Sequence, residues 1–364
     1  MGGVAARRGV GSLTIGADPM RDVIGQRRLL SRLGDQAIRG DVAQAYELSG
    51  PRSIGKNTVA LRLAQTLNCV SEPRVAGGCG ACLSCTKIEK GIHPDVIVVT
   101  RLIDLAKRND MKYITIEQVR AMQQDLALRP LEGRRRVVII DDAAELSEHA
   151  EVALLKTLEE PPSHAVLLLV TPTPSKLLET IRSRLQPMPF RLVPHAEIEA
   201  ALVTRFGASA GRFAAVAAGK PGVAITLAND EAARAARTKL EKEFYGLVAS
   251  RLTERFAWAA DLAESERDTQ KRNEQIDTRL VNWGELLRDA AVAAAGAPER
   301  ALRPERAAQS EKLAASVPTR ELVDLAQSFE RWRRDVNETT VAARMLLELL
   351  ALKLPHRPEL AVAS

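Results

Sequence analysis

GPRSIGKNT, residues 50–58, connects the apolar segment AYELS at residues 45–49 to a segment with helical spacing. A glycine-rich loop between a strand and a helix is the setting in which backbone amides and a helix N-terminus bind phosphate. A lysine in this loop neutralises the β- and γ-phosphates of a nucleotide. We therefore predict a nucleotide-binding loop formed by Gly50, Gly55, Lys56, Asn57 and Thr58.

Asn57 occupies the position after the lysine, where such loops usually carry Ser or Thr. That hydroxyl normally helps to hold Mg²⁺, and Thr58 projects about 100° further round the helix, so it is not a simple substitute. An alternative is a glycine-rich turn that keeps the loop's shape without binding nucleotide productively. The strand–loop–helix context favours a real phosphate loop, whereas Asn57 argues against productive hydrolysis of ATP with Mg²⁺.

Further apolar runs alternate with amphipathic stretches between residues 20 and 192. Strands that alternate with helices predict a parallel sheet with helices on both faces, which is an α/β nucleotide-binding architecture. The runs are HPDVIVVT at 93–100, RRVVIIDD at 135–142, AVLLLVT at 165–171 and PMPFRL at 187–192.

The second of these runs ends in Asp141 and Asp142 and resembles a Walker B strand. This resemblance predicts that Asp141 positions Mg²⁺, directly or through water. Active ATPases of this type usually carry Glu next, and Asp142 is one methylene shorter, so it reaches less far toward an attacking water. Alternatively, both aspartates cap the following helix, which we expect to begin near Ser147 or earlier.

All four cysteines lie within 17 residues, and the last three form two overlapping CxxC steps flanked by glycines. Four thiols at this spacing predict a tetrahedral site for structural Zn²⁺. Disulfides are disfavoured in a reducing cytoplasm, and a redox dithiol remains an alternative. A zinc deaminase is excluded because no H-x-E segment accompanies the CxxC. The predicted ligands are Cys69, Cys79, Cys82 and Cys85.

The remaining chain reads as helical modules. With 364 residues, two or three domains are expected. Residues 1–19 are predicted to be a disordered tail, and residues 193–245 a small helical module interrupted by GKPG at 219–222. Residues 246–364 have i, i+3/i+4 apolar spacing and predict an all-helical domain. Its core is expected to include Leu280, Trp283, Leu287, Leu322, Leu325, Phe329, Trp332, Val341, Met345 and Leu349.

Composition excludes some classes of protein but does not select one. The net charge of +6 suits a nucleic-acid partner and an ordinary soluble protein equally well. No apolar run approaches the ~20 residues needed to span a membrane, and no secretion signal begins the chain. We therefore expect a cytoplasmic protein without a membrane partner.

Taken together, these motifs resemble the clamp-loader branch of the AAA+ ATPases over residues 20–230, with LLKTLEEPP at 154–162 and TIRSR at 180–184. The resemblance implies an AAA+ domain at 20–192 with a zinc insert at 69–85. It further implies a helical lid at 193–245 and a collar, or oligomerisation, domain at 246–364. It puts Thr171 at the sensor-1 position and Arg184 at the position of an arginine finger that acts in trans on a neighbouring subunit.

Within this branch, HPD at 93–95, VTPTP at 170–174 and GKPG at 219–222 resemble the delta-prime subunit of DNA polymerase III more than the gamma/tau motor. A motor would usually carry Glu after Asp141 and an arginine in the lid. The corresponding lid segment, around Gly222 and Val223, contains no arginine. Three residues depart from the family pattern: Leu185 replaces a Cys, Val152 replaces an Asn, and Glu47 interrupts an apolar strand.

The resemblance implies a stator-like subunit of a hetero-pentamer with gamma/tau motor and delta subunits. That complex places a sliding clamp on primed DNA, and this chain would contribute no polymerase active site and little or no ATPase activity. The alternative is that the chain is itself an ATP-hydrolysing motor, because Lys56 and Asp141 are retained. A third hypothesis is a DNA-binding zinc module that uses Arg134, Arg135 and Arg136, although such residues more often form a solvated turn.

Overall fold

The computed structural model describes residues 23–101, 103–104, 109–110, 113–266, 269–297, 300–303, 306–338 and 342–360. The tail predicted at residues 1–19 and the predicted core residue Val341 lie outside this part of the chain. Two compact units are present, and each is described by itself. The first extends to Arg205 and includes Gly219–Gly222, and the second contains Phe206–Ala218 and the residues from Val223 onward.

A five-stranded sheet forms the centre of the first unit, and all its pairings are parallel. Every residue of β1 and β6 is buried, as expected for strands that are covered on both faces. This confirms the predicted parallel α/β sheet. In spatial order the strands are β2 (Val96–Val99), β5 (Arg136–Asp141), β6 (Ala165–Thr171), β1 (Ala45–Ser49) and β7 (Gln186–Pro189). Two short strands, β3 (Ile103–Asp104) and β4 (Asn109–Asp110), form a separate antiparallel pair.

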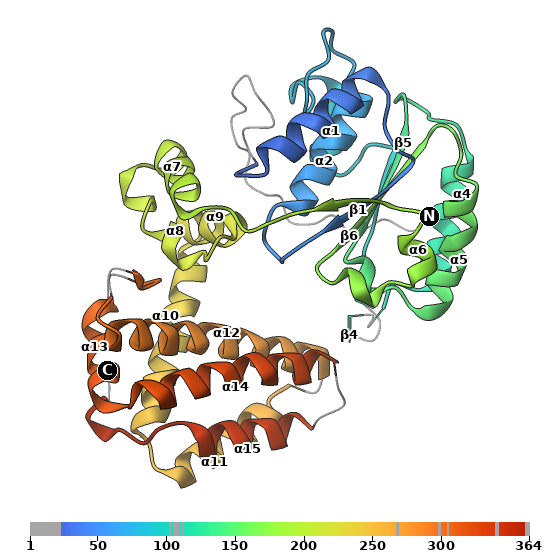
Figure 1. Ribbon diagram of the computed structural model, residues 1–364. Helices are drawn as coiled ribbons and strands as arrows, with labels where there is room; N and C mark the ends of the chain where they lie inside the picture. Colours follow the sequence, from blue (N-terminus) through green and yellow to red (C-terminus); the bar gives the residue numbers. More distant parts are fainter. Residues whose placement is uncertain are drawn as a thin grey trace. The chain divides into compact units, whose positions relative to one another are not determined.

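Helices cover the two faces of this sheet. In Figure 1, α1 (Arg27–Arg39) and α2 (Lys56–Asn68) lie on one side, and α4 (Ile116–Ala127) and α5 (Glu148–Glu159) lie on the other. Short helices α3 (Leu83–Glu89) and α6 (Glu179–Arg182) follow the cysteine-containing loop and β6, respectively. Thr115 begins α4 through a capping box with Gln118, which satisfies backbone donors at the start of that helix.

Beyond β7, every regular element in the described residues is a helix, which confirms the predicted helical C-terminal region. None of the described helices combines the length and the apolar character needed to cross a membrane. In chain order, the α-helices are α7 (His195–Phe206), α8 (Phe213–Val216), α9 (Pro221–Asn229), α10 (Glu231–Ala249), α11 (Leu252–Glu264), α12 (Thr269–Ala294), α13 (Ala307–Ser316), α14 (Thr319–Glu338) and α15 (Ala343–Lys353).

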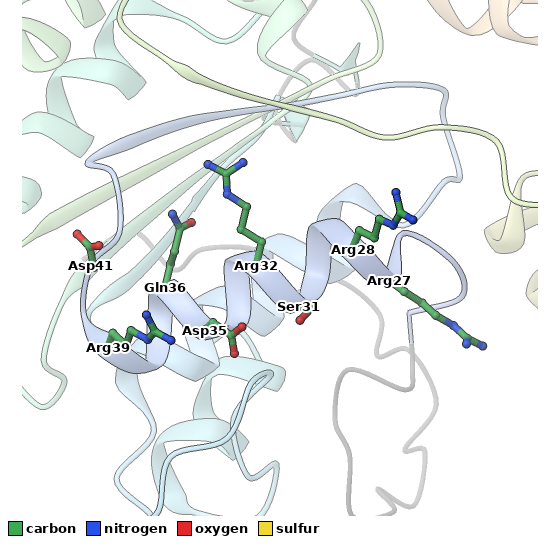
Figure 2. Close-up of a pocket in the computed structure, with 8 residues that line it drawn as sticks. All are labelled: Arg27, Arg28, Ser31, Arg32, Asp35, Gln36, Arg39 and Asp41. Atoms are coloured by element: carbon green, nitrogen blue, oxygen red, sulfur yellow. The ribbon is translucent and has the colours of Figure 1, made fainter.

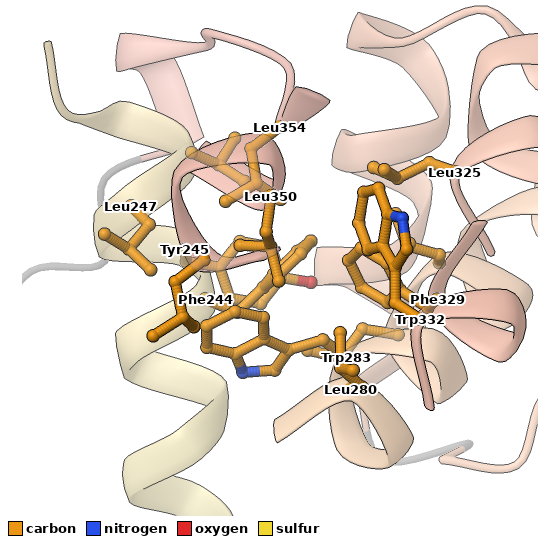
Figure 3. Close-up of a cluster of buried hydrophobic side chains, with 14 of the residues drawn as sticks. Phe244, Tyr245, Leu247, Leu280, Trp283, Leu325, Phe329, Trp332, Leu350 and Leu354 are labelled. Carbon is orange, nitrogen blue, oxygen red and sulfur yellow. The ribbon is translucent and has the colours of Figure 1, made fainter. Parts of the chain in front are cut away.

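The core of the second unit is built around Trp283, which is fully buried (Figure 3). Its ring lies 5.8 Å from Phe244 and 5.7 Å from Trp258, measured between ring centroids. The indole Nε1 donates a hydrogen bond of 2.8 Å to the Leu240 carbonyl, so the polar atom of this aromatic core is satisfied. The predicted core residues of α12 and α14 are buried, as expected from their spacing.

The prediction for α15 was wrong by one residue. Met345 is 64% exposed and Leu349 is 40% exposed, whereas Leu346 and Leu350 are buried in the core. The sequence ARMLLELLALK carries apolar residues on both sides of the helix, so their spacing fits two faces. Only packing against the other helices selects the buried face.

Candidate functional site

Three adjacent strands bring the predicted nucleotide-binding residues to one edge of the sheet. Asp141 ends β5, Thr171 ends β6, and the loop after Ser49 leaves β1. Ser49 is in register with Thr171, and the N–H of Gly50 donates to the Thr171 carbonyl at 3.3 Å. In parallel sheets, ligands bind outside the carboxyl ends of the strands, so the sequence motifs converge where a nucleotide would bind.

The loop conformation depends on its glycines. Gly50 and Gly55 have φ values of 139° and 102°, which side chains rarely tolerate. A Cβ on Gly50 would also lie 2.5 Å from the carbonyl oxygen of Phe190. Gly55 immediately precedes α2, so the loop leads directly into the N-terminus of that helix. This is the backbone geometry of a phosphate-binding loop.

Lys56 is buried, with 7% of its surface exposed. Its Nζ donates hydrogen bonds to the carbonyl oxygens of Gly50 (2.6 Å) and Pro51 (2.7 Å). Burial lowers the pKa of Lys56 to about 8, and the nearby Arg52 lowers it further against the opposing effect of Asp142. The ammonium group therefore binds the loop's own carbonyls.

The low pKa predicts how stability depends on pH. Because the folded pKa is about 8 and an unperturbed lysine has 10.5, the unfolded chain binds more protons between these values. The contribution of Lys56 to stability therefore rises with pH across this window. Thermal melts of the wild type and a Lys56→Met variant at pH 7 and pH 10 should show their difference moving in favour of the wild type at pH 10. A constant difference would contradict the pKa shift.

The candidate Mg²⁺-binding residues are partly engaged by interactions within the chain. The Asn57 amide Nδ2 donates to Asp141 Oδ1 at 2.7 Å, and Arg52 Nη2 lies 2.6 Å from Asp142 Oδ2. Among the described residues, Asn57 Oδ1 and Asp142 Oδ1 are buried without a hydrogen-bond partner. Oxygen atoms are the ligands that Mg²⁺ prefers, so the donor set fits the ion. Mg²⁺ must nevertheless compete with the Asn57 amide for Asp141.

The alternative capping role of the two aspartates was wrong for Asp142. This residue has a φ of 64° and its side chain makes no capping hydrogen bond to the short 3₁₀ turn that follows, Ala143–Glu145. Helix α5 begins later, and Ser147 caps it by accepting a hydrogen bond from the N–H of Ala150. Asp142 is therefore left facing Arg52.

Gly222 contacts the phosphate loop through its backbone. Its N–H donates to the carbonyl oxygen of Ser53 at 2.8 Å. A Cβ at position 222 would lie 2.8 Å from the same oxygen, which is closer than real Cβ atoms approach. The contact therefore requires glycine at position 222. An active motor would usually carry a lid arginine close to this position.

Arg184 lies at the surface just after α6, with 35% of its side chain exposed. Its Nη1 donates to the Thr180 carbonyl at 2.7 Å and its Nη2 to Glu159 Oε1 at 2.8 Å. Glu159 ends α5 within the LLKTLEEPP motif, and the sequence alone predicts no role for this residue. Leu185 is buried, so the hydrophobic replacement for a family Cys is a packing residue.

Glu47 acquires a partner in the folded chain. It is buried in β1, with 6% of its surface exposed, and its Oε2 lies 3.8 Å from Arg182 Nε on α6. A buried carboxylate next to a cation is less costly than an isolated one. Sequence reasoning could not find this pair, because the two residues are 135 positions apart and meet only through the fold.

The four cysteine sulfur atoms all lie within 4.8 Å of one another. Four sulfurs at ~2.3 Å from a tetrahedral Zn²⁺ are separated by about 3.8 Å, so small movements would complete such a site. A Cβ on Gly78, whose φ is 75°, would lie 2.8 Å from Cys85 Sγ, so glycine allows the loop to pass this sulfur. The donor set fits a structural Zn²⁺ ion.

The pKa is lowered for two of the four thiols. Against the opposing effect of burial, hydrogen bonds from the Ser71 hydroxyl and the Cys82 N–H lower the pKa of Cys79 to about 6. The pKa of Cys82 is also lowered, although burial acts against this, because the Cys85 N–H donates to its sulfur. Burial instead raises the pKa of Cys85. A cation among these sulfurs would favour the thiolate at every position.

The basic turn before β5 is structural, which argues against the DNA-binding zinc module. Arg136 is buried and lies 3.8 Å from Asp95, while Arg134 pairs with Glu72 at 2.9 Å. The Asp95 carboxylate accepts hydrogen bonds from three consecutive N–H groups of this turn, at residues 131–133. Despite burial, these bonds lower the pKa of Asp95. Arg136 is therefore not available to DNA.

The first unit is an α/β domain with a parallel five-stranded sheet and a P-loop-like turn before α2, and a helical region follows it. Residues 25–194 match the family model described as "DNA polymerase III, delta subunit".

Curated relatives match about half of the chain. DNA polymerase III subunit tau of Salmonella typhimurium is 40% identical over 163 residues, which are 45% of this chain and 24% of the relative. DNA polymerase III subunit gamma/tau of Mycobacterium bovis is 35% identical over 181 residues, which are 50% of this chain and 30% of the relative. The chain thus spans about a quarter to a third of the length of these relatives.

Among solved structures, a DNA polymerase III gamma subunit-related protein from Thermotoga maritima superposes with a TM-score of 0.44 at 14% identity. The superposition covers 88% of this chain and 98% of that protein.

Proposed function

We propose that this chain is a stator-like subunit of a clamp loader, of the delta-prime type, which acts in the cytoplasm during DNA replication. In this proposal it assembles with gamma/tau motor and delta subunits into a hetero-pentamer that places a sliding clamp on primed DNA. Residues 193–245 serve as the lid and residues 246–364 as the collar. Its chemical contribution is Arg184, offered to the nucleotide of an adjacent motor subunit.

The proposal rests on the contacts made by the chain's own candidate nucleotide-binding residues. Asn57 donates to Asp141, Arg52 pairs with Asp142, and Gly222 contacts the loop where a motor would have a lid arginine. Hydrolysis requires a Mg²⁺ ion and a positioned water. The Asn57 amide competes with Mg²⁺ for Asp141, and Arg52 engages the Asp142 carboxylate that would position the water. The pocket formed with Lys56 and Thr171 is thus suited at most to holding a nucleotide.

The proposal is tested by the stoichiometry and ATPase activity of purified protein. Coexpressed with motor and delta subunits, the chain should copurify as one copy per complex. Alone, with primed DNA and Mg²⁺, it should show background turnover that a Lys56→Ala substitution leaves unchanged. Turnover that disappears in Lys56→Ala would contradict the stator assignment and identify the chain as a motor.

The motor subunit is the second candidate. The likeness to gamma/tau relatives at 35–40% identity favours it, as does the retention of Lys56 and Asp141. Asn57 Oδ1 and Asp142 Oδ1 could accept water molecules bound to Mg²⁺. The same measurement of isolated turnover distinguishes the two candidates.

We also propose that Cys69, Cys79, Cys82 and Cys85 hold a structural Zn²⁺ ion. The mutual distances of their sulfur atoms and the close passage of Gly78 beside Cys85 support this assignment. A closed set of four thiolates leaves no open position for substrate, so the ion would stabilise the loop between α2 and α3 rather than act in catalysis.

A further inference from the structure

Helix α1 carries a row of arginines on its exposed side. Its other side is buried through Leu30, Leu33, Gly34 and Ala37. Arg28, Arg32 and Arg39 are exposed. At 100° per residue, the positions of these three arginines fall within about 40° around the helix axis, so they form one stripe.

The stripe lines an open hollow. Figure 2 shows its residues spread along the exposed side of α1, with Asp41 beyond the C-terminal end of the helix. Four of the eight lining residues are arginines and two are aspartates, which leaves an excess positive charge of two. The lining residues are Arg27, Arg28, Ser31, Arg32, Asp35, Gln36, Arg39 and Asp41.

Most of this charge is not compensated by ion pairs among the described residues. Arg27 pairs with Glu197 at 3.2 Å. Within the described ranges, Arg28, Arg32 and Arg39 form no ion pair, even though Asp35 and Asp41 line the same hollow. Like charges at i and i+4 repel, and the first turn of α1 carries no acidic residue to offset a cation near the positive end of the helix dipole. Arg28 and Arg32 are therefore unfavourably placed, whereas Arg39, in the last turn of α1, is favoured by the helix dipole. An anionic partner would offset the repulsion between Arg28 and Arg32.

The chemistry of the stripe fits phosphate groups. Each guanidinium presents paired N–H donors that can bind two phosphate oxygens, and Ser31 and Gln36 add neutral donors of the kind that contact nucleic-acid backbones. At 1.5 Å per residue, the arginines are roughly 6 Å and 10.5 Å apart along the helix, so flexible side chains can reach separate phosphates.

None of the eight lining residues is aromatic, so the surface offers no platform for stacking bases. Proteins that bind single strands usually combine basic grooves with such platforms. We propose that this face of α1 binds the phosphate backbone of duplex nucleic acid without reading its sequence. Direct DNA contact through α1 goes beyond the proposed action of Arg184 on the nucleotide of an adjacent subunit, and it does not depend on that action.

The test measures binding of the full-length chain to a fluorescent duplex of about 20 base pairs by anisotropy, at several salt concentrations. The variant Arg28→Gln/Arg32→Gln/Arg39→Gln should weaken binding on the order of 10²-fold in ~0.1 M salt. Its slope of log affinity against log salt should fall by about 2.7, because three phosphate contacts are lost. ATPase activity is not part of the readout, so failure of this inference is distinguishable from failure of the proposed function.

The matched control is Arg120→Gln/Arg320→Gln/Arg331→Gln, which removes three exposed arginines elsewhere. It should bind duplex nearly as the wild type does, and circular dichroism melts should show both variants folded. Equal losses in both variants would overturn the proposal, because net charge alone would then explain binding. Absence of duplex binding by the wild type, or a loss confined to a single strand of the same sequence, would also overturn it.

Discussion

Replacing Arg184 with alanine should reduce DNA-stimulated ATP turnover at the motor site that we propose it serves by roughly 10³–10⁵-fold, the range contributed by arginine fingers in other families. The guanidinium stabilises charge that develops on the transferred phosphoryl group, and no other group in a preformed site replaces it. In the isolated chain, Arg184 is bound by Glu159 at 2.8 Å. Both side chains are partly exposed, and such pairs contribute only about 0–1 kcal/mol, so the arginine is free to exchange partners.

The measurement is steady-state turnover by the reconstituted complex, with subunit stoichiometry checked by size-exclusion chromatography. Arg182→Lys is the matched control, because it replaces a guanidinium two residues away on the same segment and keeps a cation beside Glu47. We expect the control complex to keep most of its activity. An intact complex containing Arg184→Ala with unchanged turnover would refute the assignment of this residue.

The second large effect concerns the cysteine cluster. A Cys82→Ser/Cys85→Ser variant should lose one equivalent of zinc per chain and melt at a clearly lower temperature than the wild type. Structural zinc sites in small domains contribute apparent binding free energies on the order of 10 kcal/mol, and that contribution is lost with the metal. Zinc content is measured by mass spectrometry on protein purified under reducing conditions, and stability by thermal melts.

Leu83→Ser provides the control for this experiment. Leu83 lies between the two replaced cysteines and is 69% exposed, so its substitution changes the same loop without removing a ligand. This variant should retain one zinc and most of its stability. Wild-type protein that contains no zinc after reducing purification, and that does not bind added zinc, would exclude the metal site.

Much of the candidate nucleotide site was predictable because its motifs are local. The loop from Gly50 to Thr58 and the strand that ends at Asp141 each have a short sequence signature, and parallel strands place their carboxyl ends at one edge. The partners of these residues were not predictable. Arg52 meets Asp142 across 90 residues, and nothing in the sequence near either position indicates the pair.

Local sequence patterns were enough to predict the alternation of strands and helices, the positions of the candidate phosphate loop and of the strand that resembles Walker B, and the grouping of four cysteines. These features depend on local spacing, which the chain carries from residue to residue. Tertiary structure alone decided which face of α15 is buried and what Glu47 contacts. It also decided that Arg136 is held within the fold while the arginines of α1 remain exposed. Burial and charge pairing depend on contacts between segments that are distant in sequence, and a local sequence pattern does not indicate which segments meet.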